Sequence, residues 1–302
     1  MRRVIVTGAK GFIGRHSIQY LRDKNFEVHC VTTKNASVND DKGVMWHRLD
    51  LLNEKECYDL FSTVRPSHLL HFAWYTEHGK YWTSDRNHDW VNASMSMLKH
   101  FKEFNGKRAT FAGTCAEYDW GFGLCSEDTT PIMPKTRYGR CKNSLRQTAE
   151  SFCKQYDISF SWGRIFHLFG PNEQPSRLVP SVILSLLNNN EAKCTDGTQI
   201  RDFLYSEDVA SAFVSLLESS VDGAVNIASG EPVSVHDLVG KIGQKIGKVK
   251  LIRFGALPQP KDEPPLIVAD IRKLKSEVCW KPKYDLEQGL DRTIEWWREH
   301  IK

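Results

Sequence analysis

The chain has 302 residues, of which 40% are hydrophobic and 26% are charged, and its net charge is +4. These values are ordinary for a soluble globular protein, which at this length can bury a sizeable core as one α/β unit or two lobes. The positive charge is too small to predict nucleic-acid binding, although it suits an anionic small substrate. No apolar run approaches the length of a membrane span, so we expect no membrane partner.

The cysteines and histidines predict neither disulfides nor a metal site. The 8 cysteines contain no Cys-x-x-Cys pair, which is typical of reduced thiols in a cytoplasmic protein. Because Met1 leads directly into a predicted strand, we expect no signal peptide. His68 and His71 lie in an apolar run, and their odd offset on a strand points them to opposite faces. Two ligands of one ion should share a face, so we expect no metal.

A glycine-rich turn follows the first predicted strand, residues 2–6. Gly8, Gly11 and Gly14 come at three-residue spacing, and a helical pattern opens directly behind them. In such a turn the first glycine permits a sharp bend, the second lets backbone approach a pyrophosphate, and the third allows close helix packing. The helix N-terminus presents free N–H groups to the phosphates. A glycine-rich turn without a ligand is the alternative, but the order and context favour dinucleotide binding.

The end of the second predicted strand, residues 26–32, bears on the choice of cofactor. An NAD-specific fold carries an Asp or Glu about 20 residues beyond the glycines, where it binds the ribose hydroxyls. Here Thr32, Thr33 and Lys34 stand in that place. Two hydroxyls and a cation suit the 2′-phosphate of NADP, whereas a carboxylate would repel it. We therefore expect NADP(H) rather than NAD(H), with Arg15 as a weaker candidate for the same phosphate.

Strands and helices continue to alternate along the chain. Further strands are predicted at residues 44–49, 67–73 and 107–112, with helical patterns between them. This alternation predicts a doubly wound parallel (Rossmann) sheet of the α/β class, with ligands at the carboxyl ends of the strands. The connection 74–87 is long and rich in aromatic residues. Long loops at that edge are usually functional, although a packed surface lid is the simpler alternative.

Groups suited to acid–base chemistry follow the fifth predicted strand at the same edge. Thr114, Cys115 and Glu117 supply a hydroxyl, a thiol and a carboxylate. Tyr138 and Lys142 open the next predicted helix, and residues at i and i+4 share one helix face. A nearby ammonium lowers the pKa of a phenol, which would make Tyr138 usable as an acid or base near neutrality. Tyr–Lys pairs at this spacing also arise by chance. The position of this pair after the fifth strand of a dinucleotide-binding fold is what makes it evidence for a catalytic role.

Later segments complete a pattern that resembles a known family. They are residues 163–171, 200–210, 225–230 and 280–282. With the glycine turn, Thr114 and the Tyr138-x-x-x-Lys142 pair, they resemble the extended short-chain dehydrogenase/reductase family, in the epimerase/dehydratase branch that acts on nucleotide sugars. The resemblance covers nearly the whole chain. It implies a Rossmann domain over residues 1–166, joined by 203–228, and a smaller substrate-binding lobe mainly within 167–302.

The resemblance also implies roles for particular residues. Thr114, Tyr138 and Lys142 would be catalytic, and Arg201 would pair with the diphosphate of a nucleotide-diphosphate sugar. Cofactor contacts are expected from Gly8, Gly11, Phe12, Ile13, Gly14, Thr32, Thr33, Lys34, Asp50, Leu51, Phe72, Ala73, Tyr138, Lys142 and Ile165. Substrate contacts are expected from Thr114, Cys115, Glu117, His167, Lys193, Thr195 and Arg201. Helices over 89–104 and 138–156 would form a homodimer interface.

Departures from the family pattern favour a reductase. The 4,6-dehydratases follow their catalytic threonine with an Asp-Glu pair, whereas this chain has Cys115 and Ala116 and lacks that acid and base. The 4-epimerases typically hold NAD through the ribose acid that is missing here. We therefore expect NADPH-dependent reduction of the C4 keto group of a nucleotide-linked 4-keto-6-deoxy sugar, with Tyr138 as proton donor. A 4-epimerase with bound NAD(P) is the alternative, and a non-catalytic dinucleotide sensor or RNA-binding relative is a distant one.

Overall fold

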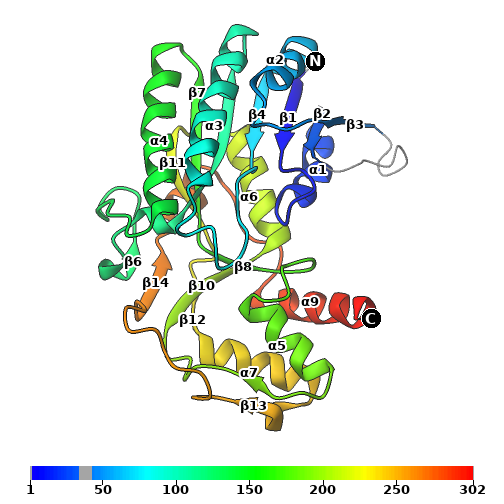
Figure 1. Ribbon diagram of the computed structural model, residues 1–302, viewed down its shortest axis with the longest axis vertical. Helices are drawn as coiled ribbons and strands as arrows, with labels where there is room; N and C mark the ends of the chain where they lie inside the picture. Colours follow the sequence, from blue (N-terminus) through cyan, green and yellow to red (C-terminus); the bar gives the residue numbers. More distant parts are fainter. Residues whose placement is uncertain (1, 34–42, 302) are drawn as a thin grey trace.

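A parallel sheet forms the larger part of the molecule, in the upper half of Figure 1. The structure is a computed structural model and describes residues 2–33 and 43–301. Within these residues the sheet has seven strands in the order β11-β7-β5-β4-β1-β2-β3, and all neighbouring pairs are parallel. The strands are β1 (Arg2–Thr7), β2 (Phe26–Thr32), β3 (Val44–Arg48), β4 (His68–His71), β5 (Arg108–Thr114), β7 (Ser159–Ile165) and β11 (Gly223–Ile227). The chain builds outward from β1 on one side and then on the other, which confirms the predicted doubly wound sheet.

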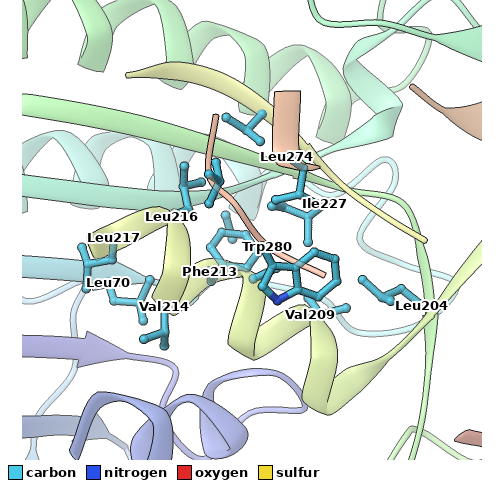
Figure 2. Packing of buried hydrophobic residues seen from close by; sticks show 14 of the residues in the cluster. Leu70, Leu204, Val209, Phe213, Val214, Leu216, Leu217, Ile227, Leu274 and Trp280 are labelled. Atoms are coloured by element: carbon cyan, nitrogen blue, oxygen red, sulfur yellow. The ribbon is translucent and has the colours of Figure 1, made fainter. Parts of the chain in front are cut away.

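Helices cover both faces of this sheet because residues in its strands alternate between two apolar cores. Val4 and Val6 of β1 belong to one core, and Ile5 between them belongs to the other. Figure 2 shows the first core, in which Phe213 lies among side chains from several elements. The helices are α1 (Gly14–Asp23) and α6 (Ser206–Glu218) on the first face, and α2 (Glu54–Val64), α3 (Arg86–Glu103) and α4 (Arg137–Gln155) on the second.

Side-chain caps fix where two of these helices begin, and a left-handed residue ends one of them. Asn53 caps α2 by accepting backbone N–H bonds, and the helix ends at Arg65 in the left-handed region with φ 46°. Thr136 caps α4, because its hydroxyl accepts the N–H of Gly139 at 3.0 Å. Such caps satisfy N–H groups that have no partner within the helix. The cap at Thr136 therefore orients the first turn of α4, where the predicted catalytic pair begins.

The second part of the molecule is built on β10 (Ile200–Tyr205), in the lower half of Figure 1. This strand pairs with β8, β12 and β14, and β14 pairs with β6. Helices α5, α7 and α9 contribute to a third apolar core against it. The remaining bounds are β6 (Leu124–Cys125), β8 (His167–Phe169), β9 (Ala192–Lys193), β12 (Pro232–Ser234), β13 (Ile252–Arg253), β14 (Leu266–Ala269), α5 (Leu178–Leu187), α7 (Val235–Ile246), α8 (Arg272–Ser276), α9 (Leu286–His300) and the 3₁₀ turns η1 (Cys115–Glu117), η2 (Trp120–Phe122) and η3 (Val249–Leu251).

The chain crosses between the two parts several times. It leaves the large sheet after β7, forms β8 and β10, and returns through α6 and β11. Residues 203–205 lie in β10, so the return to the large sheet begins with α6. The predicted catalytic and cofactor segments thus belong to the first part, whereas His167 and Arg201 come from strands of the second. None of the described helices is both long and apolar enough to span a bilayer.

Candidate active site

The glycine turn after β1 has the geometry that its sequence predicts. Gly8 has φ +67°, and a Cβ placed on it would lie 2.9 Å from the backbone nitrogen of Ala73. A Cβ on Gly14 would lie 2.3 Å from the carbonyl oxygen of Gly8, so only glycine lets α1 approach this closely. The N–H of Gly11 donates to that same carbonyl at 2.8 Å. A side chain at any of these positions would therefore disturb the turn.

A cavity of about 300 Å³ opens beside this turn. Its lining includes seven of the predicted cofactor residues, Gly8, Gly11, Thr32, Thr33, Asp50, Leu51 and Ala73. It also includes five residues that the sequence did not single out, Lys10, Val31, Leu49, Trp74 and Trp90. Trp74 follows β4 in the aromatic connection, and that connection was the signal that could have found it. The position fits a dinucleotide, because it lies at the carboxyl ends of parallel strands beside a helix N-terminus.

Other predicted cofactor residues lie outside the lining of this cavity. Phe72 packs edge-on against Phe213, with ring centroids 4.9 Å apart. Phe12, Ile13 and Ile165 are not among the described residues that line it either. The predicted residue Lys34 lies outside the described part of the chain.

Arg15, the weaker candidate for the 2′-phosphate, is turned back onto the glycine turn. Its Nε donates to the carbonyl of Gly11 at 3.0 Å, and its Nη2 donates to that of Lys10 at 3.1 Å. These bonds engage its guanidinium at the turn itself, so the structure gives no support to the phosphate role.

The three predicted catalytic residues meet at the end of β5 and the start of α4. Thr114 is the last residue of β5, and its hydroxyl bonds the phenol of Tyr138 and accepts the N–H of Ala116. The ammonium of Lys142 is buried, donates to the carbonyl of Ala112 at 2.9 Å, and lies 3.7 Å from the centre of a Trp74 ring. Trp74 therefore joins the cofactor cavity to the catalytic pair.

The charge states of the pair differ from the expectation. Burial raises the pKa of Tyr138, and its hydrogen bond to Thr114 offsets only part of this effect. Burial lowers the pKa of Lys142 to about 7, and the negative charge of Glu117 acts in the opposite direction. The expectation that Lys142 lowers the phenol pKa is thus wrong for this structure, because loss of solvent is the larger effect. Tyr138 is held in its protonated form.

The aromatic connection 74–87 encloses Tyr138. The ring centroid of Tyr138 lies 5.0 Å from that of Tyr81, 5.7 Å from that of Trp82 and 6.5 Å from that of Trp74, in edge-on arrangements. The backbone N–H of Tyr138 also donates to the carbonyl of Trp82 at 3.2 Å. Tyr138 is half-buried, and such packing fixes the orientation of its ring.

The contacts of Glu117 within the protein do not fit the predicted role in substrate binding. Its side chain is fully buried, its Oε1 accepts the indole N–H of Trp162 at 2.8 Å, and its Oε2 accepts Nε of Arg164 at 2.9 Å. Arg164 in turn donates to the hydroxyl of Tyr118, which donates to Asn226 at 2.8 Å. We call these five residues the paired cluster. The predicted substrate contact of Glu117 does not fit, because protein donors already use both oxygens.

Cys115 is also unsuited to the proton transfer considered for it. It is buried in the turn η1, and this burial raises the pKa of its thiol well above its usual range. A thiol that resists ionisation is a poor acid–base group.

Arg201 is placed on β10 as predicted, but it already has a partner. The side chain is 3% exposed, and its guanidinium pairs with Glu263 from the connection between β13 and β14. Lys193 and Thr195 lie in and just after β9, which pairs with β13. Lys193 is exposed and Thr195 is half-buried.

Three polar side chains near Arg177 have buried atoms that lack a hydrogen-bond partner among the described residues. They are Nδ1 of His78, Nδ1 of His167 and Oε2 of Glu173, which we call the unpaired cluster. Burial lowers the pKa of His167 to about 3 and raises that of Glu173 to about 8, and the charge of Arg177 affects the pKa of all three. Buried polar groups in folded proteins normally have partners, so these atoms fit a polar ligand. The sequence pointed only to His167.

The histidines of β4 have structural partners. His71 bonds the hydroxyls of Thr7 at 2.7 Å and Ser94 at 2.9 Å. The ring of His68 packs edge-on against Phe26. Over residues 2–33 and 43–301, no group of three or more His, Cys, Asp and Glu side chains is arranged to hold a metal ion.

A dinucleotide cavity beside a Tyr–Lys pair at the carboxyl edge of a Rossmann sheet defines an NAD(P)-dependent enzyme of the oxidoreductase type. Residues 4–228 match the NAD dependent epimerase/dehydratase family, and the chain belongs to that family. This confirms the resemblance to the extended short-chain dehydrogenases/reductases.

Relatives of similar length act on several nucleotide sugars. The chain is 25% identical over 318 residues to a UDP-glucuronate 4-epimerase of Thermodesulfobacterium geofontis, covering 99% of this chain and 97% of the relative. It is 27% identical over 305 residues to CDP-abequose synthase of Salmonella typhimurium, covering 96% and 97%. The structure of a UDP-glucuronic acid 4-epimerase from Bacillus cereus with UDP-glucuronic acid and NAD has a TM-score of 0.87 at 24% identity, covering 99% and 100%. This last likeness establishes the shared fold.

Proposed function

We propose that the protein is an NADPH-dependent reductase that acts on the C4 keto group of a nucleotide-linked 4-keto-6-deoxy sugar. The observation that carries the proposal is the protonated, desolvated phenol of Tyr138 beside the hydroxyl of Thr114. Reduction of a ketone requires a proton donor, whereas oxidation of an alcohol begins with a base. A 4-epimerase must oxidise its substrate first, so a raised phenol pKa favours the reductive direction.

Each catalytic residue has a distinct task in this reaction. A reduced dinucleotide, when bound, would supply the hydride that the carbonyl carbon needs. Tyr138 donates its proton to the carbonyl oxygen as negative charge develops there. Thr114 donates a hydrogen bond that orients and stabilises the same oxygen. Lys142 in its charged form stabilises the phenolate that remains on Tyr138 and holds the cofactor ribose.

The cavity supports binding of the phosphorylated cofactor, NADP(H), in preference to NAD(H). Lys10, Thr32 and Thr33 line it, and Asp50 is the one carboxylate among the described residues of its lining. Asp50 lies after β3 rather than β2, and its carboxylate accepts the N–H of Leu52 at 3.0 Å. A carboxylate at the end of β2 should reverse the preference, so Thr33→Asp should raise the NADH/NADPH ratio of kcat/KM by about tenfold or more. A wild-type enzyme that prefers NADH would contradict the proposal.

The unpaired cluster and Arg201 support a sugar nucleotide as the substrate. Hydroxyl groups of a sugar can satisfy His78, His167 and Glu173, and a guanidinium suits a diphosphate. Lys193 and Thr195 would lie along the base. Arg201 must leave Glu263 to bind the diphosphate, so the connection that carries Glu263 would rearrange when substrate enters. These contacts are compatible with more than one nucleotide base and more than one sugar.

A 4-epimerase is the second candidate, because the chain is 25% identical to a UDP-glucuronate 4-epimerase along nearly its whole length. The two reactions differ in what happens to the cofactor. An epimerase regenerates its NAD(P) within each turnover, whereas a reductase consumes NADPH in proportion to product.

The deciding experiment incubates the enzyme with a panel of nucleotide-linked 4-keto-6-deoxy sugars and NADPH, and follows NADPH absorbance and the sugar product. Stoichiometric oxidation of NADPH supports the reductase. Interconversion of 4-hydroxy sugar nucleotides without net NADPH loss would support the epimerase instead.

Tyr138→Phe is the matched variant, because it removes only the proton donor. We expect kcat to fall by roughly 10²–10⁴ with nearly unchanged NADPH affinity. Full activity of a folded Tyr138→Phe enzyme would remove the catalytic assignment.

We also propose a cytoplasmic homodimer. All eight cysteines fall within the described residues, and every one is a free thiol, which fits a reducing compartment. Helices α3 and α4 lie side by side on one face of the sheet (Figure 1) and would form the interface. Sedimentation of the purified protein as a monomer at micromolar concentration would contradict this assembly.

A further inference from the structure

The turn that follows Thr114 is held by a buried ion pair. Glu117 and Arg164 are 0% and 2% exposed, and their side chains meet at 2.9 Å. The second oxygen of Glu117 accepts the backbone N–H of Thr114 at 3.0 Å as well as the indole N–H of Trp162. Two strands of the large sheet, β7 and β11, supply Trp162, Arg164 and Asn226. The carboxylate of Glu117 is therefore bonded to residues of β7 in the large sheet.

This turn also supports the helix that carries the catalytic pair. A Cβ on Gly139 would lie 2.4 Å from the carbonyl oxygen of Ala116, so the first turn of α4 rests directly on η1. The hydroxyl of Thr114 caps η1, while Glu117 bonds the Thr114 backbone in return. A shift of Glu117 would consequently change how Thr114 faces Tyr138.

Glu117 has an electrostatic effect on Lys142 in addition. The ammonium is bounded by the carbonyl of Ala112, the rings of Trp74 and Trp162, and the neutral, buried His71. Burial disfavours its charge, and the negative charge of Glu117 raises the pKa of Lys142 against that effect. Glu117 thus helps to keep Lys142 charged at neutral pH.

We propose that Glu117 is a positioning residue of the reaction, which fixes Thr114 against Tyr138 and holds a carboxylate on the indole of Trp162, whose ring the ammonium of Lys142 also approaches. It touches neither cofactor nor sugar and acts through Thr114 and Lys142. The proposal rests on the roles assigned to Thr114 and Lys142 under the proposed function.

The test uses cofactor binding, which needs no knowledge of the sugar. Since charged Lys142 holds the cofactor ribose, NADPH affinity of the wild type should fall as pH rises through the pKa of Lys142. In Glu117→Gln, fluorescence titrations with NADPH should place the midpoint of this fall about one pH unit lower. Trp162→Phe removes the hydrogen bond to Oε1 of Glu117 but keeps the negative charge of Glu117. The midpoint of NADPH binding in this variant should therefore equal that of the wild type.

Glu117→Gln leaves Arg164 buried without its partner, and this variant could fold poorly. The double variant Glu117→Gln/Arg164→Met removes both charges and should recover stability while keeping the lowered midpoint. A folded double variant with the wild-type midpoint, or an equal shift in Trp162→Phe, would overturn the proposal. If wild-type enzyme reduces no keto sugar, the proposed function fails, but these NADPH titrations still decide the role of Glu117.

Discussion

The paired cluster and the unpaired cluster differ in whether their polar atoms have hydrogen-bond partners. In the paired cluster, Glu117, Trp162, Arg164, Tyr118 and Asn226 bond one another in a continuous chain. In the unpaired cluster, His78, His167 and Glu173 keep buried atoms without partners among the described residues. The first cluster is anchored on strands of the large sheet, and the second comes from the connection 74–87 and the segment 167–177. This difference indicates that the paired cluster orders the site, whereas the unpaired cluster has atoms that a ligand can bind.

Free-energy arguments explain why both arrangements occur in one site. A buried polar group that lacks a hydrogen bond costs about 1–3 kcal/mol of folding free energy. Such a group fits a site where a ligand supplies the missing hydrogen bond. A complete buried network avoids that cost and holds its members in one arrangement. The paired cluster can therefore orient Thr114 before substrate arrives, while the unpaired cluster leaves hydrogen-bonding capacity for the sugar.

The largest expected effect comes from replacing the arginine of the paired cluster and, for comparison, Arg177 beside the unpaired cluster. Arg164→Met leaves the buried carboxylate of Glu117 without a countercharge and should lower the free energy of unfolding by about 3–5 kcal/mol. Arg177→Met, the matched change in the unpaired cluster, should cost less than about 1 kcal/mol and raise KM for the sugar nucleotide about tenfold. Urea unfolding without ligands and steady-state kinetics measure the two effects. Equal destabilisation by both changes would show that the clusters do not differ in kind.

Arg201 shares a feature with each cluster. It is buried and paired like the first, but its partner Glu263 comes from a connection between strands rather than from the large sheet. Arg201→Ala should raise KM for the sugar nucleotide by about tenfold and change NADPH affinity much less. Glu263→Gln should lower the same KM a few-fold, because the diphosphate no longer competes with a carboxylate. Parallel loss of both affinities in Arg201→Ala would instead mark Arg201 as a structural residue of β10.

The sequence was sufficient for the fold because the sheet depends on local patterns, while the catalytic roles of Thr114, Tyr138 and Lys142 stay predictions. The alternation of strand and helix patterns predicted the doubly wound sheet, and the glycine spacing predicted a turn whose φ at Gly8 is +67°. Thr114, Tyr138 and Lys142 were predicted as catalytic from the family resemblance and from their positions after one strand and on one helix face, and the structure brings the hydroxyls of Thr114 and Tyr138 together. Spacing along a single element determines such features, so no tertiary information was needed.

The sequence was not sufficient where distant segments decide a side chain's environment. Glu117 was predicted to contact substrate, but Arg164 and Trp162, which lie more than 40 positions further along, take up its oxygens. Trp90 lines the cavity from α3, far from the glycine turn in sequence. The pKa of Tyr138 was misjudged for the same reason, since burial by several segments outweighs one neighbouring charge.

The last effect concerns the proton on Glu173 and tests whether its carboxyl is unpaired in the free enzyme. Burial raises the pKa of Glu173 to about 8, so the folded protein keeps this proton over a range in which the unfolded chain has lost it. Stability should therefore fall as pH rises from about 4.5 to 8, and the full cost is present above that range. Glu173→Gln cannot ionise and escapes this cost.

Glu173→Gln should consequently match the wild type in Tm near pH 4.5 and exceed it by about 5–8 °C at pH 9. The gain should be larger in an Arg177→Met background, because Arg177 lowers the pKa of Glu173 and partly compensates its charge. Thermal unfolding of the four proteins at both pH values measures these differences. A gain that is the same at pH 4.5 and pH 9 would mean that Glu173 titrates normally and has found a partner. In that case the unpaired cluster would shrink to its two histidines, and the sugar would lose its expected carboxyl contact.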